Sequence, residues 1–278
     1  MAQPRVLILR APGTNCDVET AYAFEKAGAK AERVHVFRLL EAPQRCREYQ
    51  IFCIPGGFSY GDDIAAGRIL ANQIRHHLAD LLREFVEAGK LILGICNGFQ
   101  VLVKANVLLP PGEGGLAQAT LGWNDSRRFE DRWVRLAVAG QTCVFLQGIE
   151  ELYLPVAHAE GKFVVRDQAV LEALESAGQL VLRYARLSGP LRVESEPLPY
   201  PENPNGSQAN VAGVCDATGR ILGLMPHPER HIDPTHHPHW TRRQVGCCQQ
   251  ATPAPQEETV VPAGDGLRLF RNATAYFA

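Results

Sequence analysis

The sequence has no excess of charge of either sign and no long apolar run. Lys and Arg number 28 against 30 Asp and Glu, which gives a formal net charge of -2 over 278 residues. Without a basic tail or stripe to neutralise phosphates, nucleic acid is not expected as a partner. No apolar stretch is long enough to cross a bilayer, and residues 1–5 run into a strand-like segment without the pattern of a secretory signal. We therefore expect a cytoplasmic protein with no membrane partner.

A dense disulfide framework is also missing. The 8 cysteines are scattered among apolar and loop segments, which favours free thiols in a reducing compartment. Residues from about 231 to 263 carry many His and Pro and no sustained apolar period, so we expect a mobile inserted loop there, within a single domain over 1–278. Its metal-binding side chains do not match the usual spacing of paired zinc ligands, and we expect no metal site: they are His231, His236, His237, His239, Cys247 and Cys248.

Short apolar segments alternate with segments of helical periodicity before residue 110. Strands are expected at residues 6–9, 33–37, 51–54 and 91–95, and helices at 19–27 and 69–88. This alternation predicts a parallel sheet covered by helices on both faces, with a ligand crevice at the carboxyl ends of the strands. Later strand candidates would complete the same sheet before a short terminal helix at 267–276: residues 133–138, 163–165, 180–184, 211–214 and 221–225.

Cys96 lies between two glycines, in Gly94-Ile95-Cys96-Asn97-Gly98, where an expected strand turns into an expected helix. A sharp turn of this kind needs small neighbours, because the backbone folds tightly beneath the exposed central residue. The positive end of the helix dipole would favour a thiolate. The pattern favours a catalytic nucleophile, although a small buried hydrophobic residue would fit it too.

A cysteine nucleophile needs a base, and the base needs an orienting group. His227 and Glu229 follow the expected strand at 221–225, separated by Pro228. Side chains two residues apart on an extended chain point the same way, and the residue before a proline is held extended. The two residues are therefore candidates for base and orienting carboxylate. A surface loop that carries a chance His and Glu is the alternative.

The third requirement is a pair of backbone donors for a tetrahedral oxyanion. The N–H of Asn97, directly after the nucleophile, is the expected first donor. Gly57 is the expected second, because a residue without Cβ lets the backbone approach closely. Pro55-Gly56-Gly57 could also be an ordinary turn. Each motif is weak alone, and the combination on one α/β sheet is specific.

The combined motifs resemble the class I, triad-type glutamine amidotransferases. Further segments, spread over nearly the whole chain, narrow the resemblance to the glutaminase subunits of the phosphoribosylformylglycinamidine synthases of the purine pathway. The family has a flavodoxin-like three-layer α/β sandwich with a mostly parallel central sheet, the class I glutamine amidotransferase fold. The stretch from about 231 to 264 is longer than in the compact form of these subunits. The matching segments are Ala11-Pro12-Gly13-Thr14-Asn15-Cys16-Asp17, Pro55-Gly56-Gly57-Phe58-Ser59-Tyr60-Gly61-Asp62, Cys96-Asn97-Gly98-Phe99-Gln100, Pro155-Val156-Ala157-His158-Ala159-Glu160-Gly161, Asn203-Pro204-Asn205-Gly206-Ser207 and Met225-Pro226-His227-Pro228-Glu229-Arg230.

The resemblance implies a division of labour between subunits. Cys96 would attack the carboxamide of glutamine, and His227, oriented by Glu229, would protonate the departing ammonia. Water would hydrolyse the glutamyl thioester, and ammonia would pass to a synthetase subunit that holds ATP and Mg and converts formylglycinamide ribonucleotide to the amidine. A small bridging subunit is a possible further partner. This chain should bind no cofactor, because Gly112-Glu113-Gly114-Gly115 lacks the lysine of a phosphate-binding loop.

Other residues are candidates for the glutamine pocket. Ser59 and Tyr60 offer hydroxyls, and Asp62 offers a charge for the amino group of the substrate, although a structural loop would explain them equally. The segment His158-Ala159-Glu160 repeats the spacing of the expected base and its carboxylate. We assign it no catalytic role, and the family resemblance implies a place at the rim of the site or on the surface that faces the partner. The full set of pocket candidates is Phe58, Ser59, Tyr60, Gly61, Asp62 and Gln100.

Three alternatives remain at this point. The chain could be an amidotransferase subunit of another synthetase, which differs only in where the ammonia goes. It could be a non-catalytic binding module of flavodoxin-like fold with a redox-sensitive cysteine, or a stand-alone cysteine hydrolase that is active without a partner.

Overall fold

The computed structural model describes residues 3–140, 142–242 and 263–278. Within these ranges a nine-stranded sheet runs in the order β2-β1-β3-β4-β11-β10-β9-β6-β7, and β5 pairs with β8 in a separate sheet. The strands are β1 Arg5–Arg10, β2 Lys30–His35, β3 Ile51–Ile54, β4 Leu91–Ile95, β5 Ala119–Gly122, β6 Glu130–Val138, β7 Glu151–His158, β8 Lys162–Val165, β9 Leu182–Tyr184, β10 Val211–Cys215 and β11 Ile221–Leu224. The helices are α1 Asp17–Lys26, α2 Val36–Glu41, α3 Arg68–His77, α4 Ala79–Glu87, α5 Asn97–Lys104, α6 Gln168–Ser176 and α8 Asp265–Ala275.

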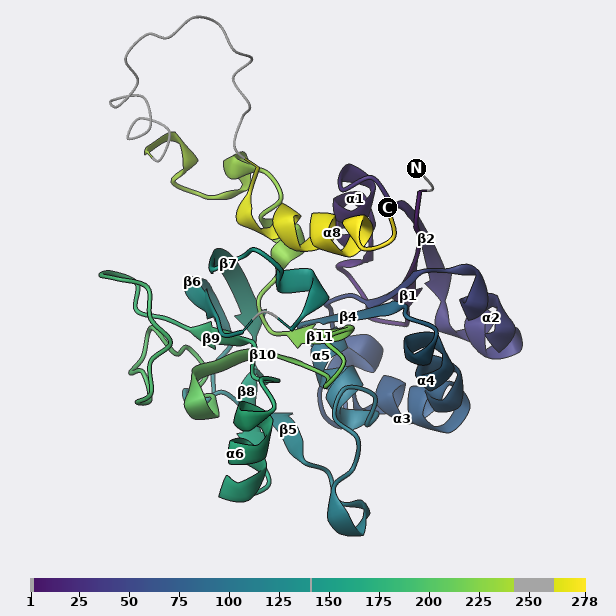
Figure 1. The fold of residues 1–278 in the computed structure, drawn as a ribbon, viewed down its shortest axis with the longest axis horizontal. Coiled ribbons are helices and arrows are strands. Elements are labelled where there is room, and N and C mark those ends of the chain that lie inside the picture. Colours follow the sequence, from purple (N-terminus) through teal and green to yellow (C-terminus); the bar gives the residue numbers. More distant parts are fainter. Residues whose placement is uncertain (1–2, 141, 243–262) are drawn as a thin grey trace, which may run out of the picture.

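The large sheet has a parallel half and an antiparallel half. Strands β2, β1, β3, β4 and β11 run parallel, and β10, β9, β6 and β7 continue the sheet in antiparallel pairs. Helices α1 and α8 cover one face, and α3, α4 and α5 cover the other (Figure 1). Every residue of β3, β4 and β11 is buried, which explains their unbroken apolar sequences. The predicted three-layer α/β fold is confirmed.

Two predictions in the parallel half are wrong in detail. The strand expected at 33–37 lies earlier, at β2, and the chain turns at His35 into α2, where the His35 ring caps the N–H of Phe37. Strand β2 is half exposed at the sheet edge, so its apolar pattern is weak. The helix expected at 69–88 is broken at Leu78, because α3 packs on α5 whereas α4 packs on β4.

Two predictions in the antiparallel half also need correction. Residues 163–165 were expected to extend the main sheet, but they belong to β8, which pairs with the unpredicted β5. Strand β7 was unpredicted although its residues alternate between buried and half-buried. It contains Pro155, which argues against a strand, but β7 lies at the sheet edge, where a missing N–H is tolerated.

The expected inserted loop at about 231–263 is described only in part. Residues 243–262, which include Cys247 and Cys248, lie outside the described residues. Among residues 231–242, His231 and His237 are buried and both rings contact Trp133, whereas His236 and His239 are exposed. The mobile inserted loop stays a prediction. The terminal helix predicted at 267–276 is confirmed as α8, which packs on α1. The single-domain division stays a prediction.

Four parallel strands end on the same side of the sheet and position the site. The loops that follow β1, β3, β4 and β11 carry Thr14, Gly57, Cys96 and His227, and Thr14 and Gly57 pair in an isolated bridge. The start of α5 is pressed against the end of β3, because a Cβ on Gly98 would lie 1.9 Å from the carbonyl oxygen of Ile54. In the described parts of the chain, no helix has the length and apolar character needed to cross a membrane.

The close approach at Gly98 generates a stability prediction. Gly98→Ala should lower the free energy of unfolding by about 1–3 kcal/mol, because the added methyl group must push α5 off β3. Gly122→Ala is the matched control, since a Cβ there meets nothing within 4 Å. Chemical denaturation of both variants measures the difference; equal stabilities would contradict the packing described here.

Candidate active site

Cys96 occupies a sharp turn between β4 and α5. Its backbone angles are φ 51° and ψ -105°, a conformation that costs energy for a residue with a side chain. The turn is held from both sides: the Cys96 N–H donates to the carbonyl oxygen of Leu224 at 2.7 Å, and the Cys96 carbonyl accepts from the N–H of Gln100 at 3.1 Å. Gly94 and Gly98 are so close that a Cβ on Gly94 would lie 2.7 Å from the Gly98 oxygen. The strand-to-helix elbow expected from the sequence is present.

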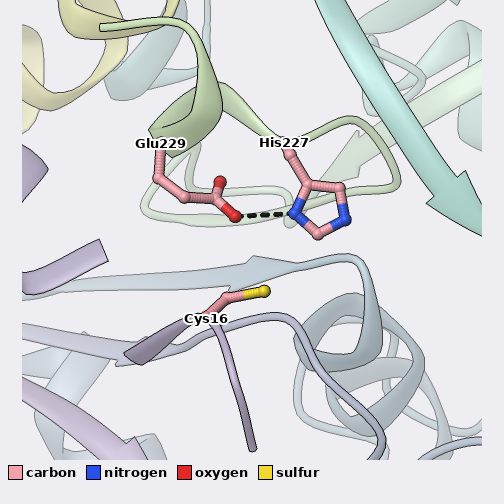
Figure 2. A group of neighbouring side chains, drawn as sticks. All are labelled: Cys16, His227 and Glu229. Carbon is pink, nitrogen blue, oxygen red and sulfur yellow. Dashed lines mark hydrogen bonds and ion pairs between the residues drawn. The ribbon is translucent and has the colours of Figure 1, made fainter. Parts of the chain in front are cut away.

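His227 and Glu229 form a buried pair beside this turn. The Nδ1 atom of His227 lies 2.6 Å from Oε1 of Glu229, and their side chains are 2% and 0% exposed (Figure 2). The carboxylate accepts the Nδ1 proton, and the other ring nitrogen, Nε2, points away from Glu229. The N–H of His227 donates to the oxygen of Pro155 at 2.8 Å, which anchors His227 on β7.

Opposing effects act on the imidazole. Burial by itself would lower the pKa of His227, but the negative charge of Glu229, followed by the sulfurs of Cys96 and Cys16, raises it well above its usual value. The protonated ring is therefore favoured next to a cysteine sulfur. Such an imidazolium stabilises a thiolate, the nucleophilic form of the side chain.

The two expected oxyanion donors lie on the loop after β3 and at the start of α5. Gly57 has φ +141°, and a Cβ on it would lie 2.8 Å from the nitrogen of Asn15, so only glycine fits. Asn97 is the first residue of α5, where backbone N–H groups have no partner within the helix. Its side chain is occupied elsewhere: Nδ2 donates to Gln100, and Oδ1 accepts from the N–H of Ser59.

A cavity of about 260 Å³ opens on one side of Cys96 and contains most of the predicted pocket residues. Tyr60 is not among its lining residues, because its hydroxyl turns to α3 and donates to Gln73. Ser59 is buried outside the lining, and its hydroxyl finds no partner within the described ranges. Burial raises the pKa of the Asp62 carboxyl. The lining comprises Gly57, Phe58, Gly61, Asp62, Ala66, Cys96, Gln100, Trp123, Ala157, His158, Ala159 and Glu160.

The segment His158-Ala159-Glu160 lies closer to the site than its expected place at the rim suggests. His158 is buried, its Nδ1 is 3.1 Å from Oδ1 of Asn124, and burial together with the charge of His227 lowers its pKa to about 3. It is therefore neutral at pH 7, and its low pKa makes it a much weaker proton acceptor than an ordinary histidine. Glu160 lines the cavity near Asp62, its carboxylate accepting from the N–H of Ala66 at 3.3 Å.

Cys16 is a residue near the base that sequence reasoning missed. It caps α1 and is buried; its sulfur accepts from Arg230 at 3.1 Å and its thiol donates to Asn15 at 3.2 Å. The ligand atoms of Cys16, His227 and Glu229 lie within 4.8 Å of one another, close enough to hold a metal ion (Figure 2). However, His227 and Glu229 already bind each other, and the Arg230 cation contacts the sulfur. These contacts explain the cluster without an ion.

Comparison with known proteins agrees with this geometry. Residues 3–277 match the model of the CobB/CobQ-like glutamine amidotransferase domain. The phosphoribosylformylglycinamidine synthase subunit PurQ of Dehalococcoides mccartyi is 47% identical over 99% of this chain and 98% of its own length. The PurQ subunit of Methanococcus maripaludis is 40% identical over 99% of this chain and 97% of its own.

The chain belongs to the PurQ family of glutamine amidotransferases. A chain in the structure of PurLQS from Thermotoga maritima superposes on it with a TM-score of 0.67, 28% identity and full coverage of both chains. A glutamine amidotransferase of Thermotoga maritima, at 16% identity and a TM-score of 0.52 over 97% of both chains, shares the fold.

The neutral imidazole of His158 gives this PurQ family member a specific pH dependence. The pKa of His158 is about 3 in the folded protein and about 6.5 when unfolded, so the unfolded chain binds the extra proton first on acidification. Its contribution to stability is complete above pH 6.5 and is lost as the pH falls toward 3. Between pH 6.5 and 4.5 it should remove about 2 kcal/mol from the free energy of unfolding. Denaturation curves of the parent protein and of His158→Gln at both pH values test this, and equal pH slopes would contradict it.

Proposed function

We propose that the chain is the glutaminase subunit of phosphoribosylformylglycinamidine synthase: it hydrolyses glutamine through a thioester on Cys96 and delivers the ammonia for de novo purine biosynthesis. The observation that carries the proposal is the buried contact of 2.6 Å between His227 and Glu229 beside the strained turn at Cys96. Nucleophile, base and orienting carboxylate come from the ends of adjacent parallel strands, and the family supplies the substrate class.

The first step forms the thioester. The Cys96 thiolate attacks the carboxamide carbon of glutamine, and the developing oxyanion is stabilised by the N–H groups of Gly57 and Asn97. The imidazolium of His227 gives its Nε2 proton to the leaving nitrogen, the C–N bond breaks and ammonia departs. Glu229 stabilises the charged ring before transfer and keeps the neutral ring in the correct tautomer afterwards.

The cavity beside Cys96 supplies the binding energy that orients glutamine. Asp62 and Glu160 place two carboxylates in its lining, which suits the positive amino group of an amino acid. The Gln100 side chain is held by Glu160, whose carbonyl oxygen accepts from Nε2, and by Asn97. The pocket residues thus connect directly to the helix that carries the oxyanion donor, so that substrate binding and the nucleophile are aligned together.

Ammonia leaves for a synthetase subunit, which binds ATP, Mg and formylglycinamide ribonucleotide and forms the amidine. This chain needs no cofactor of its own, because every step above uses side chains and backbone groups. Exposed aromatic residues support a partner surface at the mouth of the pocket: Phe58, Trp123 and Phe129 are 45%, 53% and 50% exposed. A small bridging subunit and a cytoplasmic location complete the proposal.

Removal of the nucleophile or of the orienting carboxylate should affect the chemistry differently. Cys96→Ala should abolish glutamine hydrolysis and the glutamyl adduct, which intact-mass spectrometry detects. Glu229→Gln keeps the shape but loses the charge, so kcat should fall at least about a hundredfold while glutamine still binds. The assay is run with and without the synthetase, its nucleotide substrate and ATP. Hydrolysis by Cys96→Ala at the parent rate would refute the mechanism.

The carboxylate at position 62 should determine recognition of the substrate amino group. Asp62→Asn should raise KM for glutamine by about tenfold or more with a smaller effect on kcat, because it removes a charge from binding. The matched probe is glutaramate, which lacks the α-amino group and should inhibit the parent and Asp62→Asn equally. A parallel loss of glutaramate inhibition would show general damage to the pocket instead.

A further inference from the structure

A second, smaller cavity is also lined by Cys96. It measures about 60 Å³ and shares Gly57, Phe58, Cys96 and Ala157 with the larger cavity. Its remaining walls are different: Asn15, Cys16, Phe129, His227 and Arg230. A water molecule occupies about 30 Å³ in the liquid, so the space suits one or two small molecules and excludes an amino acid.

The Nε2 atom of His227 lies at this cavity near two sulfur atoms. His227 is 2% exposed and its Nδ1 is bound to Glu229, while within the described residues Nε2 has no hydrogen bond of normal geometry and interacts with the sulfurs of Cys96 and Cys16. Figure 2 shows this second ring nitrogen turned away from Glu229. A buried polar atom without a partner is costly unless a small ligand satisfies it. A small molecule in this cavity could therefore hydrogen-bond to Nε2 of His227 while lying next to Cys96.

In the function proposed above, each cavity receives a different part of the reacting carboxamide. Glutamine fills the larger one, and its carbonyl oxygen faces the N–H groups of Gly57 and Asn97. The nitrogen must then lie near Nε2 of His227 to receive a proton, which is the position of the smaller cavity. After ammonia has left, a nucleophile in the smaller cavity can reach both the thioester carbon and Nε2 of His227.

Resting on the function proposed above, we propose that the smaller cavity holds the water that hydrolyses the glutamyl thioester, and that Cys16 is a positioning residue that keeps this space open. Water adds its oxygen to the thioester carbon while Nε2 of neutral His227 takes its proton. Collapse of the adduct breaks the C–S bond, the proton passes from His227 to the sulfur of Cys96, and glutamate leaves.

Cys16 is suited to this place by size and by its contacts. A Cβ on Gly56 would lie 2.7 Å from Cε1 of His227 and 3.1 Å from the Cys16 sulfur, so no bulk is tolerated between them. Burial raises the pKa of Cys16, which keeps the thiol protonated, and Arg230 and Asn15 hold the sulfur from two directions. The Cys16 side chain is thus a small, fixed part of the cavity wall, and its protonated thiol does not compete with Cys96 as a nucleophile.

The test is to fill the cavity. Cys16→Val projects an extra methyl group into it and should slow deacylation without slowing acylation. In the complex with the synthetase, kcat and KM for glutamine should fall in parallel, each at least about tenfold, while kcat/KM stays unchanged and the thioester accumulates in acid-quenched samples. Cys16→Ser restores the space and a hydrogen-bonding group, and should bring kcat back toward the parent value. Cys46→Val is the control, because Cys46 is equally buried and lines neither cavity.

A second variant tests the same proposal even if Cys16→Val fails to fold. Phe129 is half exposed, and Phe129→Ala opens the smaller cavity to a nucleophile larger than water. With hydroxylamine present, the ratio of glutamyl hydroxamate to glutamate should rise several-fold over the parent ratio. The proposal is overturned if this ratio is unchanged, or if Cys16→Val lowers kcat/KM without accumulation of thioester. Absence of any thioester in the parent protein would instead refute the proposed function.

Discussion

The contact between the first turn of α5 and the end of β3 is the constraint on which the site depends. Gly98 lies against the carbonyl of Ile54, and this approach lets Cys96 adopt a positive φ at the carboxyl edge of the sheet. The strain at one residue is offset by two backbone hydrogen bonds and by the packing of α5 on β4. Because β4 is paired in register with β11, the same contact fixes the distance between Cys96 and the loop that carries His227.

Electrostatic interactions then determine which of the buried groups His227, Glu229 and Cys16 carry a charge. A buried charge is costly unless a partner compensates it, and here Glu229 compensates His227 in the dry interior. The carboxylate also fixes which ring nitrogen carries the proton, so one contact serves both stability and chemistry. Cys16 is uncharged because burial raises its pKa. It therefore limits the space beside His227 without bringing a second negative charge to the ring.

Much of this site could be predicted from the sequence because its signals are local. The glycines around Cys96, the proline after His227 and Gly57 each act within a few residues of the backbone they shape. Cys16, by contrast, is distant in sequence from His227, and only the arrangement of β1 next to β3 brings it to the base. Strand β7 could not be predicted for a different reason. Pro155 argues against a strand, and a proline is tolerated there only because β7 is at the sheet edge, a position that depends on the strand order of the complete sheet.

The two His-x-Glu segments show where sequence spacing stops being informative. His227 and His158 are each followed two residues later by a glutamate, and both rings are buried near Cys96. At His227 the ring meets the carboxylate of its own Glu229, whereas at His158 it meets the amide oxygen of Asn124. An amide oxygen accepts a hydrogen bond but supplies no charge to balance an imidazolium. His158 therefore stays neutral and accepts a proton poorly, all the more because a charged His227 lies nearby, so of these two histidines only His227 is suited to hold a proton beside Cys96.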